Sequence, residues 1–532
     1  MYQQPSKILK HLERTCCHPR LHTAVILATP SFTHLLDKDN DFLAKAVHEL
    51  SLGGASGPTI GSAPASFNIR TRSAIVDRLP PDTGLNLRPQ NSSRGNEGIS
   101  VLALGEELRS LRAEHIVPGS SSPNAHVRFV VQHVDRGQQV IALPVANTMF
   151  RNGRESTSYE DIWEVGTALK NGTCFQRKSR APLKSFEVAV TSAGGGPFVG
   201  IPMLPLTRPC EIGSSIGNVL RELKRGDTGK LFPASTDLEV AVPQFLKSPW
   251  LTETAKNGFS VFALITCKDF YATASEEVRT GVRPPGRRVL LDGLFDGRAR
   301  LHRVTGGGGG WGNKKGLLSL EPGIDVFADN HDLLPPLPPE GGNYDFRGAS
   351  ALTSTGDNVQ FLAVFPGQQG PVEDEPSREA FLEKETGMTI AWRTRYRNTY
   401  PRVVIGTSPP DEEHSSAATN SSSPGDKLIF APNYFGMLSE GGACLGRMNG
   451  NPLHPDDGNE PVSFTSRLDI PFTALLDEAS LRHPSTGLGK AGKLSYYNAP
   501  KGGVPKPLRR RTYRPLVEQP EEQGTEPSTH KA

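Results

Sequence analysis

The sequence predicts a mixed α/β protein of the α+β kind, in which β-rich sheets carry segregated helices and long disordered connectors join the folded parts. Most apolar residues occur in short runs of strand length, and the strand and helix candidates do not alternate as a regular βαβ repeat would. The chain of 532 residues contains 55 Gly and 45 Pro and is 36% hydrophobic, a composition that favours long loops between folded parts.

The first predicted elements are a strand at residues 21–29 and a helix at residues 41–50. Residues 24–28 are continuously apolar, which is typical of a strand buried on both faces. In the helix, apolar side chains recur at helical spacing. The same strand-rich stretch predicts further strands at 73–76, 99–104, 125–134 and 139–145, with a helix at 106–115.

A second strand-rich stretch runs from residue 258 to residue 365. Two helices are predicted between the stretches, at 214–223 and 235–246, and each begins with a Ser placed to accept backbone N–H groups. The strands predicted in the second stretch cover residues 259–267, 288–291, 298–304, 316–320 and 359–365.

These elements divide the chain into six parts. They are a basic amphipathic N-terminal segment (1–20), a strand-rich α/β domain (21–230), a second strand-rich part with a glycine loop (231–406), a disordered linker (407–426), C-terminal strands (427–490) and a basic, then acidic, disordered tail (491–532).

Composition argues against several classes of protein. No apolar run approaches the roughly 18 to 20 residues that cross a bilayer, so we expect a soluble protein without membrane insertion. The net charge of +3 gives no overall field that would attract nucleic acid. The six cysteines are scattered and the histidines show no metal-ligand spacing, so we predict neither a metal site nor a cofactor.

Residues 1–20 carry the one predicted targeting signal. Leu9, Leu12 and Cys16 share one face of a short helix, and basic residues share another. This pattern is typical of a mitochondrial presequence, which makes mitochondria the predicted location. The alternative is an ordinary helix whose apolar side packs beside the following strand, in a cytoplasmic protein. Basic residues outnumber the single acid, Glu13: they are Lys7, Lys10, Arg14 and Arg20, with His11 and His18.

The most unusual segment is the glycine run between two predicted strands. Glycines can turn backbone N–H groups inward around an anion, while lysines add charge and a tryptophan offers a stacking face. The alternative is a wide hairpin loop that binds nothing, and the phosphate-loop motif itself is absent. The ligand-binding residues predicted here are Arg303, Gly306, Gly307, Gly308, Gly309, Gly310, Trp311, Lys314 and Lys315.

No catalytic residue is predicted. Residues 213–217 match the Gly-x-Ser-x-Gly pattern of a nucleophile elbow, but prolines crowd the segment where a buried strand should precede it. We therefore interpret Ser214 and Ser215 as helix-capping residues. Asp292 and Asp296 each precede a glycine, which suits turns.

The basic tail is the second predicted contact. Tyrosines are interleaved with its basic residues, so the tail could follow the phosphates of RNA while its rings stack on bases. A solvated tail neutralised by the acids that follow it is the alternative. The residues predicted to make this contact are Lys506, Arg509, Arg510, Arg511 and Arg514.

Two resemblances to known families follow from particular segments. VTGGGGGWGNKKGLLSLEP, EGGNYDFRG and KAGKLSYYNAPKGGVPKPLRRR resemble a family of filamentous-fungal proteins that carries no assigned activity. A family name associated with it refers to a V-type c subunit, which is a bundle of membrane helices and does not suit a chain without a membrane-spanning run. TAVILATPSF and IALPVANTMFRNGRES are similar to FIST sensory domains, which implies a small-ligand sensor.

Together these observations predict a non-enzymatic intracellular protein that binds an anionic small molecule or a protein partner. Two alternatives stay open. One is a ribonucleoprotein-associated factor that holds RNA through its basic tail. The other is an enzyme that acts on a phosphorylated substrate at the glycine loop.

Overall fold

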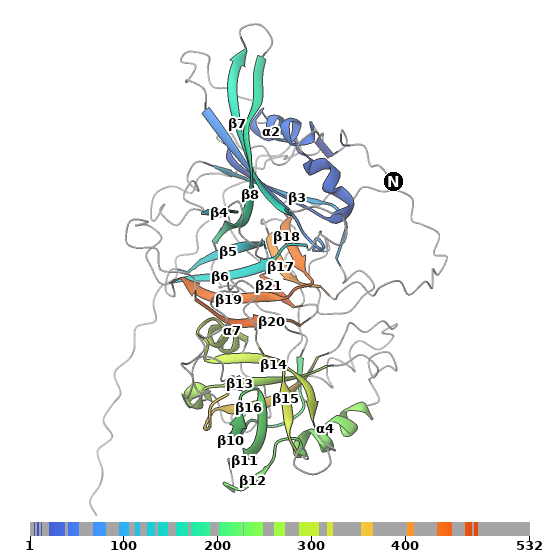
Figure 1. Cartoon of the computed structure of the whole chain (residues 1–532), viewed down its shortest axis with the longest axis vertical. Coiled ribbons are helices and arrows are strands. Elements are labelled where there is room, and N and C mark those ends of the chain that lie inside the picture. The colour runs from blue at the N-terminus through green and yellow to red at the C-terminus, as the bar shows by residue number, and fades with distance from the viewer. Residues whose placement is uncertain are drawn as a thin grey trace, which may run out of the picture. The chain divides into compact units, whose positions relative to one another are not determined.

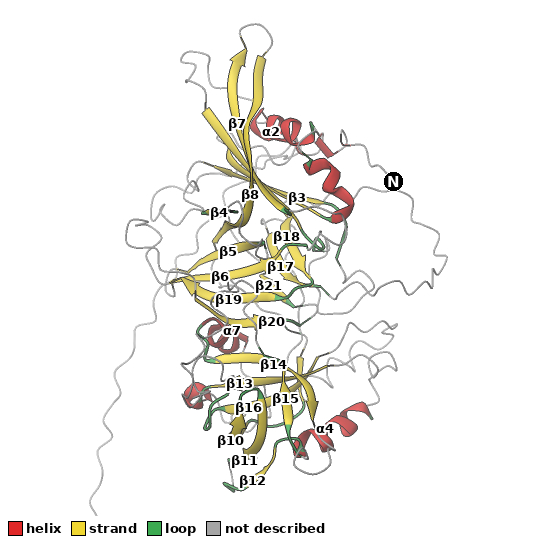
Figure 2. Cartoon of the chain, viewed as in Figure 1, coloured by secondary structure: helices red, strands yellow, loops and turns green. Residues whose placement is uncertain are grey.

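The computed structural model confirms the predicted fold class, because sheets dominate and helices are few (Figures 1 and 2). None of the helices in the part described is long and apolar enough to span a membrane. The structure describes residues 5, 8, 9, 12, 21–37, 41–52, 67–80, 95–105, 112–116, 125–133, 137–146, 156–168, 172–191, 201, 203–226, 228–247, 260–271, 287–307, 316–322, 353–364, 402–408, 434–448, 463–470 and 473–476.

The first sheet has ten strands in the order β20-β19-β6-β5-β8-β7-β2-β1-β3, with β4 paired to β8. Its central strand β8 pairs with β7 along one half and with β5 and β4 along the other. The strands are β1 (Leu21–Ala28), β2 (Phe67–Ile75), β3 (Ile99–Gly105), β4 (Ala113–His115), β5 (His126–His133), β6 (Gly137–Pro144), β7 (Ser158–Ala168), β8 (Gly172–Thr191), β19 (Ala443–Met448) and β20 (Ser463–Leu468).

Strand β1 is buried on both faces, as its continuous apolar run predicted. Val25 and Leu27 point into one core, and Ala24 and Ile26 point into another. The second core lies under the 3₁₀ helix η1 (Pro30–Leu36) and helix α2 (Phe42–Leu52). Because β1 and β2 are parallel, the chain between them must cross over, and η1 and α2 lie on that crossover. We call η1, α2 and the core beneath them the cap.

The second sheet closes on itself. The order β10-β11-β15-β14-β13-β16 returns to β10, where Cys210 pairs with Val359, so six antiparallel strands form a ring around an apolar interior. Strands β9 and β12 extend it. Its elements are β9 (Met203–Pro205), β10 (Cys210–Ile216), β11 (Val219–Lys224), β12 (Leu231–Pro233), α4 (Thr236–Leu246), β13 (Ser260–Thr266), η3 (Lys268–Tyr271), α7 (Arg287–Phe295), β14 (Ala299–Gly307), β15 (Leu318–Leu320) and β16 (Asn358–Val364).

A third, three-stranded sheet packs on the first. Its order is β18-β17-β21, and apolar side chains of β17 and β18 join the core on the other face of β1. The Gly436 N–H donates to Ser100 Oγ at 3.3 Å, and the Glu440 N–H donates to Asp77 Oδ2 at 2.9 Å. The strands are β17 (Arg402–Thr407), β18 (Tyr434–Ser439) and β21 (Ala474–Leu476).

Hydroxyl groups of β20 donate hydrogen bonds to the C-terminal end of α7. Thr465 Oγ1 and Ser466 Oγ donate to the Leu294 carbonyl at 2.7 and 2.8 Å, so carbonyls left without partners at a helix end are satisfied. Arg447 of β19 adds an ion pair with Asp296 at 2.6 Å. The last two strands of the first sheet are thus bonded to the chain of the closed ring.

Several sequence-based predictions need correction. Residues 214–223 form most of the β10–β11 hairpin instead of a helix, because Gly217 takes a positive φ of 59° and turns the chain. Residues 288–291 lie in α7 instead of a strand, which also places Asp292 in a helix. Asp296 does precede a turn at Gly297, as predicted. Helix 235–246 is confirmed, but the capping role predicted for its first serine is wrong: Ser235 makes no side-chain hydrogen bond to the backbone of the helix, and its Oγ donates to Glu239 Oε1 at 2.6 Å.

The helix predicted at 106–115 is wrong where it can be compared, since Ala113–His115 form β4. The linker predicted at 407–426 begins too early, since Thr407 belongs to β17 and Ser408 is buried; residues 409–426 and the whole tail lie outside the described residues. The two strand-rich stretches contribute to separate sheets. The chain passes from the first sheet to the second between β8 and β9. It returns to the first sheet with β19 and β20.

We expect acid to weaken the closed ring through His302 of β14. Its side chain is buried, and burial lowers its pKa although a hydrogen bond to the Glu321 carbonyl at 3.2 Å raises it. Below about pH 6.5 the unfolded chain binds a proton that the folded one resists, so stability is lost as the pH falls.

The measurement is urea unfolding of the wild type and His302→Gln at about pH 7.5 and about pH 5.5. Other titrating groups contribute equally to the stability lost by the wild type and by the variant, so their contributions cancel when the two losses are compared. The wild type should lose more stability than the variant on acidification, and equal losses would contradict the role given to His302.

Candidate functional site

The glycine run predicted as a ligand site is described only at its start. Arg303 is exposed on β14, and Gly306 and Gly307 end that strand. These three residues lie along one strand. Among the described residues, no further predicted ligand-binding side chain lies beside them. The other predicted residues, Gly308, Gly309, Gly310, Trp311, Lys314 and Lys315, lie outside the described residues.

Packing explains two glycines of this region. Gly307 has a positive φ of 149°, and a Cβ atom there would overlap the Leu317 carbonyl just before the start of the adjacent strand β15. Gly316 has a φ of 83° and lies against Pro233. Gly306, by contrast, faces open space. A close neighbour and a positive φ therefore explain the glycines at 307 and 316, whereas neither explains Gly306.

The serine and tail predictions have different outcomes. Ser214 lies in β10, where its Oγ donates to Glu222 Oε2 at 3.0 Å, so Ser214 and Ser215 are strand residues instead of helix caps. The predicted tail residues Lys506, Arg509, Arg510, Arg511 and Arg514 lie outside the described residues. Their role stays a prediction.

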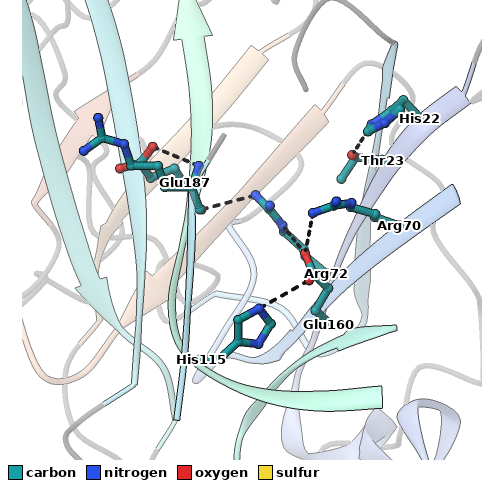
Figure 3. A network of polar contacts seen from close by, with 8 residues as sticks. His22, Thr23, Arg70, Arg72, His115, Glu160 and Glu187 are labelled. Carbon is teal, nitrogen blue, oxygen red and sulfur yellow. Dashed lines mark hydrogen bonds and ion pairs between the residues drawn. The ribbon is translucent and has the colours of Figure 1, made fainter. Parts of the chain in front are cut away.

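Among the described residues, buried charge is concentrated in the first sheet, where side chains of β2, β7 and β4 lie close together (Figure 3). In β2, Arg70 and Arg72 share one face because side chains alternate along a strand. Strand β7 runs antiparallel to β2 with Arg72 opposite Glu160. We call Arg70, Arg72, His115 and Glu160 the Glu160 site.

Arg72 and Glu160 form its buried centre. Arg72 Nε donates to Glu160 Oε1 at 3.1 Å, and the two residues are 3% and 4% exposed. Arg72 Nη1 also donates to the Arg112 carbonyl at 3.3 Å. Burial lowers the pKa of Arg72, while the charge of Glu160 raises it. Such a pair survives burial only when its geometry and hydrogen bonds compensate for lost water.

Two exposed side chains, those of Arg70 and His115, flank this centre (Figure 3). Arg70 Nη1 lies 3.8 Å from Glu160 Oε1, and His115 Nε2 lies 3.6 Å from Glu160 Oε2. Both separations exceed a hydrogen bond. The Arg70 and His115 side chains are 46% and 50% exposed, whereas that of Glu160 is 5% exposed. One buried carboxylate therefore holds two solvent-facing groups close to each other.

A second buried acid continues the network through the backbone. The Arg112 N–H donates to Glu187 Oε2 at 3.2 Å, and the Glu187 N–H donates to the Arg112 carbonyl at 2.9 Å. Burial raises the pKa of Glu187, against the lowering effects of that hydrogen bond and of nearby arginines. The same carbonyl accepts from Arg72, so Glu187 helps to position the Glu160 site.

Further charged residues lie next to this network. Arg128 Nη1 contacts Glu114 Oε1 at 2.8 Å, and Arg128 Nε donates to His126 Nε2 at 3.0 Å. The charged residues of the network and its surroundings are therefore Arg70, Arg72, Arg112, Arg128, Glu114, Glu160 and Glu187, together with His115 and His126.

The residue after Glu160 points to the opposite face. Asp161 is fully buried there, with Arg177 Nε at 3.5 Å and Arg180 Nη1 at 3.6 Å from its Oδ1 atom. Burial raises the pKa of Asp161 and lowers that of Arg180. Arg180 Nη2 also donates to the Leu36 carbonyl at 2.7 Å, which ties the sheet to η1. This second cluster therefore supports the cap.

Sequence reasoning missed the Glu160 site. The signal available was a pair of arginines two residues apart, Arg70 and Arg72, in a segment otherwise suited to a strand. Glu160, which pairs with Arg72, is 88 residues away from it in the chain. Strongly perturbed charged groups gather at functional sites, which makes this network the candidate site.

A scan of protein-family models, a search of curated proteins and a search of solved structures found no match to this chain. The resemblances to the fungal family and to FIST domains therefore stay predictions.

The buried and exposed members of the Glu160 site should differ sharply in their effect on stability. We expect Arg72→Met to cost about 3 to 5 kcal/mol, because it leaves the Glu160 carboxylate buried without its main counter-charge. Arg70→Met, on the exposed side, should cost less than about 1 kcal/mol. Urea unfolding of the two variants checks this, and equal losses would show that Arg72 does not compensate Glu160.

The glycine run offers a matched pair of substitutions. Gly306→Ala should leave stability unchanged within about 0.5 kcal/mol, since its Cβ enters open space. Gly307→Ala should lower stability by about 1 to 3 kcal/mol through overlap with the Leu317 carbonyl. Thermal unfolding of both measures the difference. A stable Gly307→Ala would remove the steric explanation for that glycine.

Proposed function

We propose that this protein is a non-enzymatic binding protein that holds an anionic small molecule at Arg70 and His115. The single observation that carries the proposal is the convergence of these two exposed side chains on one buried carboxylate, Glu160, which Arg72 already compensates. The ligand's negative charge would meet the guanidinium of Arg70, which lies farther from Glu160 than a hydrogen bond, and the ring of His115 would supply an N–H donor beside it.

Charge supports this proposal. Arg72 makes the close hydrogen bond to Glu160, and Arg70 approaches the same oxygen only at 3.8 Å. Much of the donor capacity of Arg70 is therefore left for another acceptor. A guanidinium presents two parallel N–H groups that match a carboxylate or phosphate, which makes either group the expected feature of the ligand.

Preorganisation supports it as well. Arg70 and Arg72 are fixed by the pairing of β2 with β7, and His115 belongs to β4, which β8 holds. Groups placed by strands need less ordering when a ligand arrives than groups on loops do. Binding at this site would therefore retain most of the energy of its charged hydrogen bonds.

The proposal is tested by calorimetric titration with inorganic phosphate and with citrate, up to about 10 mM. We expect Arg70→Ala to weaken binding about 10- to 100-fold, the value of one charge-assisted hydrogen bond. Arg221→Ala removes an exposed arginine from β11 of the closed ring and serves as the matched control. It should leave the affinity unchanged.

Two results would overturn the proposal. One is the absence of binding by both anions over that range of concentration. The other is an equal loss of affinity in Arg70→Ala and Arg221→Ala, which would indicate binding by general surface charge.

A further inference from the structure

The N-terminal segment contributes side chains to the core of the cap. Residues Pro5, Ile8, Leu9 and Leu12 are helical where the structure describes them. Leu12 is 4% exposed and belongs to the apolar cluster beneath the cap, and Ile8 and Leu9 pack against that cluster. This apolar side is therefore an internal part of the fold.

The cluster that receives Leu12 is the one that holds α2 on the sheet. It contains Ala24 and Ile26 of β1, Leu43 and Val47 of α2, and several further buried side chains. Leu43 and Val47 are fully buried. Exposing Leu12 would also open contacts made by its cluster neighbours, because core side chains interlock closely.

The same apolar side is the recognition face of the basic amphipathic pattern. Leu9 and Leu12 share one helical face, and Lys7, Lys10 and Arg14 share another. A receptor that reads an amphipathic helix takes its apolar face into a groove. One face cannot occupy the receptor groove and the core of the cap at the same time.

We propose that residues around Leu12 form a mitochondrial address that folding conceals. In the unfolded chain the amphipathic segment is free to engage an import receptor. In the folded protein Ile8, Leu9 and Leu12 are withdrawn into the cap, and the apparent affinity of a receptor falls with the small fraction of molecules in which the segment is released. Folding and import thus compete for one set of side chains.

Release of the segment is measured by limited trypsin digestion and mass spectrometry, at the cleavage sites after Lys7, Lys10, Arg14 and Arg20. Leu43→Ala loosens the cluster under the cap, and Leu220→Ala removes an equally buried leucine from the closed ring. We expect cleavage to be at least about tenfold faster in Leu43→Ala than in the wild type. Leu220→Ala should resemble the wild type.

A milder pair of variants covers the case in which Leu43→Ala does not fold. Val47→Ala trims the cap cluster, and Val359→Ala trims the closed ring. The first alone should accelerate cleavage. If folded wild-type protein is cut at these sites as rapidly as the urea-unfolded chain, the segment is not docked and the proposal fails.

Uptake by isolated mitochondria tests the address itself. The full chain, with a carboxyl-terminal tag, is presented either folded or freshly diluted from urea, and the fraction protected from added protease is measured. The unfolded chain should be taken up about tenfold more than the folded chain, and folded Val47→Ala should exceed folded Val359→Ala. Equal uptake of folded and unfolded wild type, or no uptake of the unfolded chain, would overturn the proposal.

Discussion

The pairing register of β7 is the constraint on which the rest of the first sheet depends. It places Glu160 opposite Arg72 and, one residue later, Asp161 opposite Arg180, so that consecutive acids meet arginines on opposite faces. A slip of one residue would turn both acids to the wrong face and leave the buried charges without partners. The register is therefore held by charge on both sides of the sheet.

The two faces of β7 support different roles. On one, the exposed side chains of Arg70 and His115 lie on paired strands beside Glu160, which is the arrangement on which the proposed anion binding rests. On the other, Arg180 bonds η1 and so supports the cap, whose core includes Leu12. Ligand binding and concealment of the N-terminal segment are thus proposed for opposite faces of one sheet.

Two strands from late in the chain complete one edge of the first sheet. Strand β19 pairs with β6, although some 300 residues separate them, and β20 pairs with β19. A hydroxyl group of β20 also donates a hydrogen bond to a carbonyl at the end of α7. Contacts so distant in sequence form slowly, because the conformational entropy of a long loop must be lost before these contacts can stabilise the fold. The described core of the cap contains no residue of β19 or β20, so docking of the N-terminal segment does not depend on these late contacts.

What the sequence by itself determined was local. The buried strand near residue 25, helix α2 and helix α4 were predicted because the spacing of apolar residues is a property of neighbouring residues. The glycine run was also recognisable, although only the approach of Leu317 explained Gly307. The β10–β11 hairpin was mistaken for a helix, since its apolar spacing suits either until strands such as β15 pair with it. The Glu160 site was decided by tertiary structure alone, because Arg72 and Glu160 meet through strand pairing that no local pattern encodes.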